Sequence, residues 1–138
     1  SDYEFQIGKA VTIKAGKDIT LIGTGSILKD ILGIADRMKE DGIQARVVNI
    51  HTIKPIDSET IVRAAEETGK IVTIEDHNVI GGLGSAVAEV LAESGMKIRF
   101  KRYGLLDFSV GYGTYAQVKE MNGMGIDGIY ADLMRWIC

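Results

Sequence analysis

Side chains that can exchange protons gather in one short segment of the chain. Asp76, His77 and Asn78 follow directly after Ile71-Val-Thr-Ile-Glu75, an apolar run typical of a strand covered on both faces. His77 is one of only two histidines, and histidine is the side chain that most readily exchanges protons near neutral pH. Glu75 and Asp76 are a candidate acid and base, although adjacent residues on an extended chain point to opposite faces. A structural or interface role for His77 is the alternative to a chemical one.

A glycine loop follows this polar turn and is a candidate anion site. The loop is Gly81-Gly82-Leu83-Gly84-Ser85, and an amphipathic helical pattern begins within it. The first amides of a helix have no partner inside the helix, so they bind carboxylates and phosphates. The structural alternative is that these glycines permit a left-handed turn and close packing of the helix on the preceding strand.

Other patterns of functional residues are incomplete. Gly23-Thr24-Gly25-Ser26 resembles half of a nucleotide-binding turn, but Leu28 occupies the position of the third glycine. No lysine followed by serine or threonine completes a Walker loop. No second histidine stands four residues from the first, and there is no cysteine pair, so we expect no metal site.

Composition excludes several classes of protein. The 138 residues suffice for one domain, and 46% hydrophobic with 25% charged residues is ordinary globular composition. A net charge of −3 argues against a nucleic-acid partner. No apolar run approaches the about 20 residues of a membrane span, and no secretory signal opens the chain. Cys138 is the single cysteine, so a disulfide framework is impossible and we expect a cytoplasmic protein.

Strand and helix patterns alternate along the chain, which predicts an α/β fold with a mostly parallel sheet and helices on both faces. The predicted strands are Ile19–Gly23, Arg46–Ile50, Ile71–Ile74 and Lys97–Lys101. The predicted helices follow these strands, with two more near 115–121 and 128–136. The segment Phe5–Lys14 is less clear and is a candidate short edge strand.

Local signals set the ends and faces of these elements. Thr24 or Ser26 is a candidate cap for the first helix, and Asp57 is the predicted cap of the second, which ends at Gly69. The predicted apolar face of the first helix comprises Ile27, Ile31, Ile34, Ala35 and Met38. In Lys97–Lys101 apolar and basic residues alternate, which favours a sheet edge with one solvated face over a basic ligand stripe.

Four segments carry a resemblance to a known family: Ile7–Ala10, Gly16–Ser26, Ile53–Asp57 and, most strongly, Thr73–Val87. With these segments in this order, nearly the whole chain resembles the C-terminal domain of transketolase and its thiamine-diphosphate-dependent relatives. The resemblance implies a single domain over residues 1–138 with a three-layer α/β/α sandwich. It implies a five-stranded mixed sheet whose first strand, near Ala10–Lys14, is antiparallel, so that residues 1–15 form a lead-in segment and edge strand.

Within this family, transketolase itself is the best match. The run His51-Thr-Ile-Lys-Pro55 resembles transketolase more than deoxyxylulose-phosphate synthase, and so do Tyr103–Phe108 and Gly111–Gly113. The β part of 2-oxoacid dehydrogenase E1 resembles a pattern with prolines after the last strand, whereas Pro55 is the only proline here. The synthase and the dehydrogenase component remain the alternatives.

The resemblance also implies which domains of the complete enzyme bind the cofactor and carry out catalysis. The family holds thiamine diphosphate through Mg²⁺ with a Gly-Asp-Gly motif in its upstream domains, and this chain contains no such tripeptide. We therefore expect no catalytic, cofactor-binding or metal-binding residue here, and an inactive isolated domain. The expected partners are the N-terminal transketolase domains or subunit, in a homodimer that transfers a two-carbon ketol unit between sugar phosphates.

The candidate interface or active-site-approach residues lie in the segment described first. They are His77, Asn78, Gly81, Gly82, Gly84 and Ser85. A rival hypothesis from another class is a stand-alone regulatory module that binds an anion or a nucleotide at Gly81–Ser85.

Overall fold

The structure is a computed structural model that describes residues 8–76, 82–105 and 125–138. In these residues one sheet of five strands has the order β1-β3-β2-β4-β5. The strands are β1 (Val11–Lys14), β2 (Ile19–Gly23), β3 (Ala45–Asn49), β4 (Lys70–Asp76) and β5 (Arg99–Leu105). The helices are α1 (Leu28–Glu40), α2 (Ser58–Thr68), α3 (Leu83–Ser94) and α5 (Ile126–Ile137), with a 3₁₀ helix η1 (Gly25–Ile27) before α1.

The strand directions confirm the expected mixed sheet. β1 is antiparallel to β3, with Val11 opposite Asn49, while β2, β3, β4 and β5 are mutually parallel. β1 therefore forms one edge of the sheet, so Val11–Lys14 of the uncertain segment is an edge strand. β5 forms the other edge, as its alternating pattern predicts.

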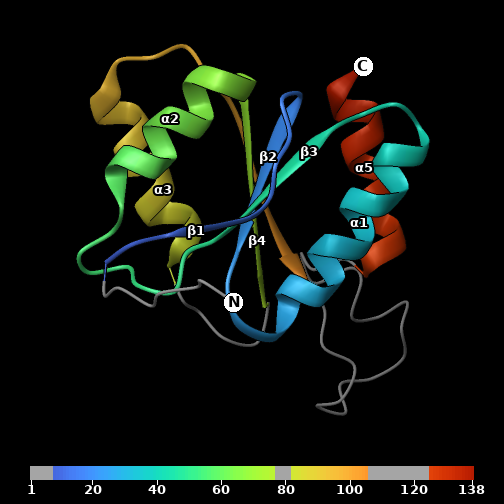
Figure 1. The fold of residues 1–138 in the computed structure, drawn as a ribbon, viewed down its shortest axis with the longest axis horizontal. Coiled ribbons are helices and arrows are strands. Elements are labelled where there is room, and N and C mark those ends of the chain that lie inside the picture. The colour runs from blue at the N-terminus through green and yellow to red at the C-terminus, as the bar shows by residue number, and fades with distance from the viewer. Residues whose placement is uncertain (1–7, 77–81, 106–124) are drawn as a thin grey trace.

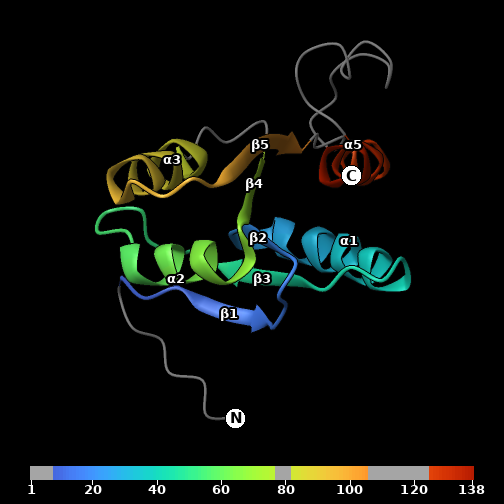
Figure 2. The same cartoon turned by 90° about the horizontal axis from the view of Figure 1, so that it is seen from above.

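Two helices cover each face of the sheet (Figures 1 and 2). α1 and α5 pack on one face, and the predicted apolar side of α1 is buried there throughout. α2 and α3 pack on the other face, where Ile61 and Val87 meet Ile22 and Ile71 of the sheet. The chain is thus a three-layer α/β/α sandwich with one apolar cluster between each helical layer and the sheet.

The predicted ends of α2 are confirmed. The Asp57 carboxylate accepts hydrogen bonds from the Thr60 amide at 3.2 Å, the Thr60 hydroxyl at 2.6 Å and the Ala10 amide at 2.9 Å. Gly69 ends the helix with a φ of 71°. Asp57 therefore also fastens the entry to β1 onto the α2 layer.

The predicted cap of the first helix is wrong. Thr24 makes no capping hydrogen bond, and Ile27 precedes α1 with helical φ and ψ. The reason is the 3₁₀ turn of η1, which moves the start of α1 past the reach of the Thr24 and Ser26 side chains.

Two basic residues of β5 contact α5 while remaining accessible to water. Arg99 stacks over the Trp136 ring with its guanidinium carbon 4.5 Å from the ring centroid, and Lys101 lies 3.3 Å from Asp132. α5 supplies both partners, although Arg99 stays exposed and Lys101 half-exposed, so the expected solvated edge is confirmed and these two residues also contact α5. α5 confirms the helix predicted near 128–136, whereas the helix predicted near 115–121 lies outside the described residues.

Candidate functional site

The order of the strands creates a crevice at the carboxyl ends of β2 and β4. The chain leaves β2 toward β3 through α1 and leaves β4 in the opposite direction toward β5 through α3. Ligands of open α/β sheets bind at such a point of reversal. The crevice has a volume of about 250 Å³ and is lined by Thr24, Gly25, Ser26, Ile27, Ile53, Glu75, Asp76 and Leu83. The incomplete nucleotide-binding turn thus lies beside the two acidic residues of β4.

Glu75 binds the amino end of α3. Its two carboxylate oxygens accept hydrogen bonds from the amides of Leu83 and Gly84, each at 2.9 Å. The positive end of a helix dipole stabilises an acidic group placed there. Two amides of the predicted anion site are therefore already bound to a carboxylate of the same chain.

The two described glycines of the loop have the structural roles of the alternative interpretation. Gly82 has a φ of 70°, a left-handed conformation that costs other residues strain. A Cβ added to Gly84 would lie 2.6 Å from Cδ of Arg102 and 3.0 Å from both Oε2 of Glu75 and Oγ1 of Thr73. The absence of a side chain at Gly84 is what lets α3 approach β4 and β5 so closely.

A second groove lies beside the crevice, between the start of α3 and the end of β5. Its volume is about 380 Å³, and it is lined by Glu75, Asp76, Gly82, Ser85, Arg102, Tyr103 and Gly104. Nη1 of Arg102 donates a hydrogen bond to Oγ of Ser85 at 3.3 Å. Sequence reasoning missed Arg102 because the predicted strand stopped at Lys101, one residue short of it.

The sequence-based candidates are brought together only in part. Gly82 and Ser85 line the second groove, and Gly84 lies beneath Arg102. His77, Asn78 and Gly81 lie outside the described residues. An interface role for these six residues stays a prediction.

In the residues that the structure describes, no set of side chains fits the Mg²⁺ of the resembled family's cofactor. The sequence has no Gly-Asp-Gly motif, and the described part of the chain brings together no group of three His, Cys, Asp or Glu side chains suited to a metal. Among the helices that the structure describes, none has the length and apolarity needed to cross a membrane.

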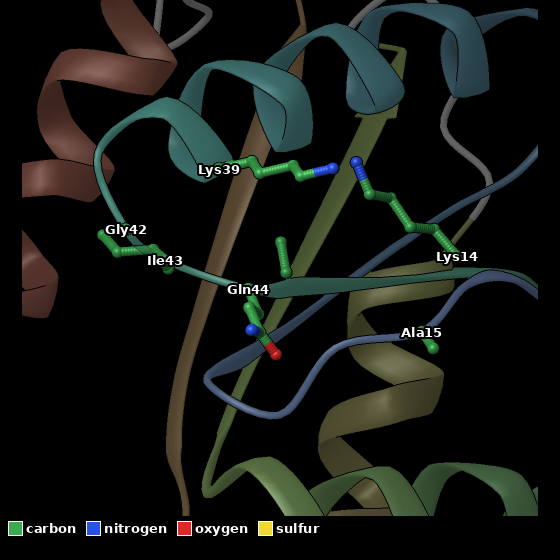
Figure 3. Close-up of a pocket in the computed structure, with 7 residues that line it drawn as sticks. Lys14, Ala15, Lys39, Gly42, Ile43 and Gln44 are labelled. Atoms are coloured by element: carbon green, nitrogen blue, oxygen red, sulfur yellow. The ribbon is translucent and has the colours of Figure 1, made fainter.

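A third hollow lies away from this edge, at the amino end of β3 (Figure 3). It has a volume of about 330 Å³, and Lys14 and Lys39 extend their ammonium groups toward one another across it. Lys14 is bound to Asp36 at 2.9 Å. Because the hollow is at the opposite end of the parallel strands, it is no part of the carboxyl-edge site.

Comparison with known proteins identifies the family. The model of the family described as transketolase, C-terminal domain, matches residues 8–129. The chain belongs to this family. The match includes the crevice at the point of reversal, the Glu75 contact with α3 and Arg102.

The relatives are longer proteins. A subunit of the apulose-4-phosphate transketolase of Phocaeicola vulgatus is 38% identical over 99% of this chain and 43% of its own length. A 1-deoxy-D-xylulose-5-phosphate synthase of Desulfitobacterium hafniense is 39% identical over 91% of this chain and 20% of its own. A solved split-gene transketolase, described as an inactive β4 tetramer, has a TM-score of 0.79 at 39% identity, over 97% of this chain and 44% of that one. This chain thus spans less than half the length of each of these relatives.

Proposed function

We propose that this domain is the C-terminal part of a transketolase, which moves a two-carbon ketol unit from one sugar phosphate to another. The observation that supports this most is the family match over residues 8–129, together with a transketolase subunit that aligns with 99% of the chain. In this proposal the domain contributes packing and assembly, and other domains supply the catalytic centre.

The missing cofactor motif supports this division of work. Thiamine diphosphate and Mg²⁺ belong to the N-terminal domains or subunit in this proposal, because no residue set in the described part of this chain fits them. No step of the reaction is assigned to a residue of this domain. The complete enzyme is a cytoplasmic homodimer in this proposal.

The carboxyl edge of the sheet is the proposed contact surface with a partner domain or the second subunit. It comprises the six candidate residues His77, Asn78, Gly81, Gly82, Gly84 and Ser85. Two features support this choice: the edge holds the crevice at the point of reversal, and Gly82 has open space where a side chain would project.

Substitution at Gly82 tests this surface in the complete enzyme. Gly82→Arg is expected to weaken subunit association at least tenfold, because a bulky charged side chain would enter the contact. Gly82→Ala shares the strain of the left-handed backbone without the bulk and is expected to associate nearly normally. Gly42→Arg is the matched control, since Gly42 also has a positive φ (82°) and open surroundings but lies at the opposite end of the sheet. If the two arginine variants associate equally well in sedimentation velocity experiments, the proposed contact surface is refuted.

The second candidate function is that of a deoxyxylulose-phosphate synthase. A specific observation favours it: a synthase of this kind is 39% identical to the chain, as similar as the transketolase subunit. The product formed by the complete enzyme separates the two. Formation of 1-deoxyxylulose phosphate, with no ketol transfer between sugar phosphates, would favour the synthase.

A further inference from the structure

Arg102 is an exposed residue whose side chain is restricted by contacts with α3. Its aliphatic chain lies over Gly84, where the missing side chain leaves room for Cδ, and its guanidinium donates to the Ser85 hydroxyl at 3.3 Å. Arginine side chains lose considerable rotamer freedom when they bind a ligand. Because α3 already restricts this one, part of that entropic cost is met before any ligand arrives.

The charge of Arg102 has no carboxylate partner in the described part of the chain. Three other arginines pair with acids: Arg37 with Asp127 at 2.7 Å, Arg46 with Glu67 at 2.7 Å and Arg135 with Asp132 at 3.3 Å. Glu75 lines the same groove as Arg102, but its two oxygens accept from the amides of α3. A positioned guanidinium therefore faces the groove with most of its donors available.

We propose that this groove binds the phosphate group of a small molecule, with the Arg102 guanidinium and the Ser85 hydroxyl as donors. A guanidinium matches the geometry of phosphate oxygens with two parallel hydrogen bonds, and a hydroxyl adds a third donor. The groove volume of about 380 Å³ falls in the range of small-molecule sites. The ligand is a phosphate ester or free phosphate. Its identification as a sugar phosphate approaching the catalytic centre rests on the proposed function.

Asp76 lines the same groove and opposes an anion there. Its carboxylate and that of Glu75 make the groove mixed in charge, so a phosphate binds against two like charges and with one opposite charge. This arrangement predicts that substitutions at Asp76 and Arg102 change the affinity for phosphate in opposite directions. Removing the charge of Asp76 strengthens binding, whereas removing the charge of Arg102 weakens it.

The test is an isothermal calorimetric titration of the complete enzyme with inorganic phosphate at constant ionic strength. The binding component that depends on Arg102 is read from the difference between the wild type and Arg102→Gln. This variant is expected to bind at least about tenfold more weakly, because a charged donor is lost, and Ser85→Ala about threefold more weakly. Asp76→Asn is expected to bind severalfold more tightly. Arg63→Gln is the matched control, since Arg63 is an exposed arginine in a separate groove on α2.

Comparison of inorganic phosphate with ribose 5-phosphate distinguishes the two sources of the phosphate group. Tighter Arg102-dependent binding of the sugar phosphate supports a substrate-derived ligand, and equal affinities support free phosphate. Equal binding by Arg102→Gln and Arg63→Gln would overturn the proposal. It would also be overturned if phosphate failed to bind and Arg102→Gln impaired subunit association, because the guanidinium would then pair with a partner's acid. Ketol transfer that persists without Arg102-dependent phosphate binding would overturn this inference and leave the proposed function standing.

Discussion

Glu75 joins a strand to a helix through a single carboxylate. Both of its oxygens accept from the amides at the start of α3, and hydrogen bonds to a charged acceptor are stronger than those between neutral groups. These two hydrogen bonds hold Gly84, at the start of α3, close to β4. Glu75 therefore lines both cavities at the carboxyl edge and holds the start of α3 beside them.

Glu75→Gln is expected to lower the free energy of unfolding by about 1–3 kcal/mol, because the neutral amide keeps one oxygen and leaves one helix amide without its acceptor. Urea denaturation at neutral pH measures the change. Glu66→Gln on α2 is the matched control, since Glu66 is exposed and its loss is expected to cost under about 0.5 kcal/mol. Similar unfolding midpoints for the two variants would show that the Glu75 contact does not stabilise the fold.

At the scale of elements, polar contacts around Asp132 help to hold α5 to the sheet. The Tyr103 hydroxyl donates to Asp132 at 2.5 Å, and Lys101 lies 3.3 Å away. The hydrogen bond from Tyr103 lowers the pKa of Asp132 more than partial burial raises it, and Lys101 lowers that pKa further. Burial raises the pKa of Tyr103, and the neighbouring Asp132 carboxylate raises it again.

These shifts make the attachment of α5 pH-dependent. Because the folded pKa of Asp132 lies below its unfolded value, the stabilisation is complete above the unfolded pKa and is lost as the pH falls through the folded pKa. Asp132→Asn is therefore expected to be less stable than the wild type by about 1–2 kcal/mol at pH 7, with the difference vanishing in the acid range. Denaturant unfolding across this range measures it. Asp127→Asn removes an exposed pair with Arg37 and is expected to have little effect. If Asp132→Asn lost the same stability at every pH, the result would contradict a stabilising role for the ionised Asp132 carboxylate.

Most features with local signals were predicted correctly, but the cap of α1 was not, because the turn of η1 comes before that helix. The apolar face of α1 follows from helical spacing, and the ends of α2 follow from Asp57 and Gly69. Contacts between residues that are far apart in the sequence were not predicted. The solvated edge at β5 was predicted, but the contacts of Arg99 with Trp136 and of Lys101 with Asp132 were not, because these partners lie far away in the sequence.

The same limit applies to the candidate site. Sequence order places the polar turn and the glycine loop at the carboxyl edge, because parallel strands end there together. The bond from Glu75 to amides eight and nine residues later follows from no spacing rule. Neither does the position of Arg102 over Gly84, which brings two residues 18 apart in sequence into contact across two elements.

At the scale of the whole molecule, the fold presents a point of strand reversal, and the sequence contains no Gly-Asp-Gly motif. The sandwich has an apolar cluster on each face of the sheet. In the described part of the chain, no group of three His, Cys, Asp or Glu side chains could hold a metal ion. These observations support our proposal that catalysis needs an assembly with other domains.

Calorimetric titration with thiamine diphosphate and Mg²⁺ tests this proposal most directly. The 138-residue chain, with its fold verified by circular dichroism, is compared with the complete enzyme. We predict no saturable binding by the chain alone and a saturable site in the complete enzyme. A micromolar site in the chain alone would contradict the proposal.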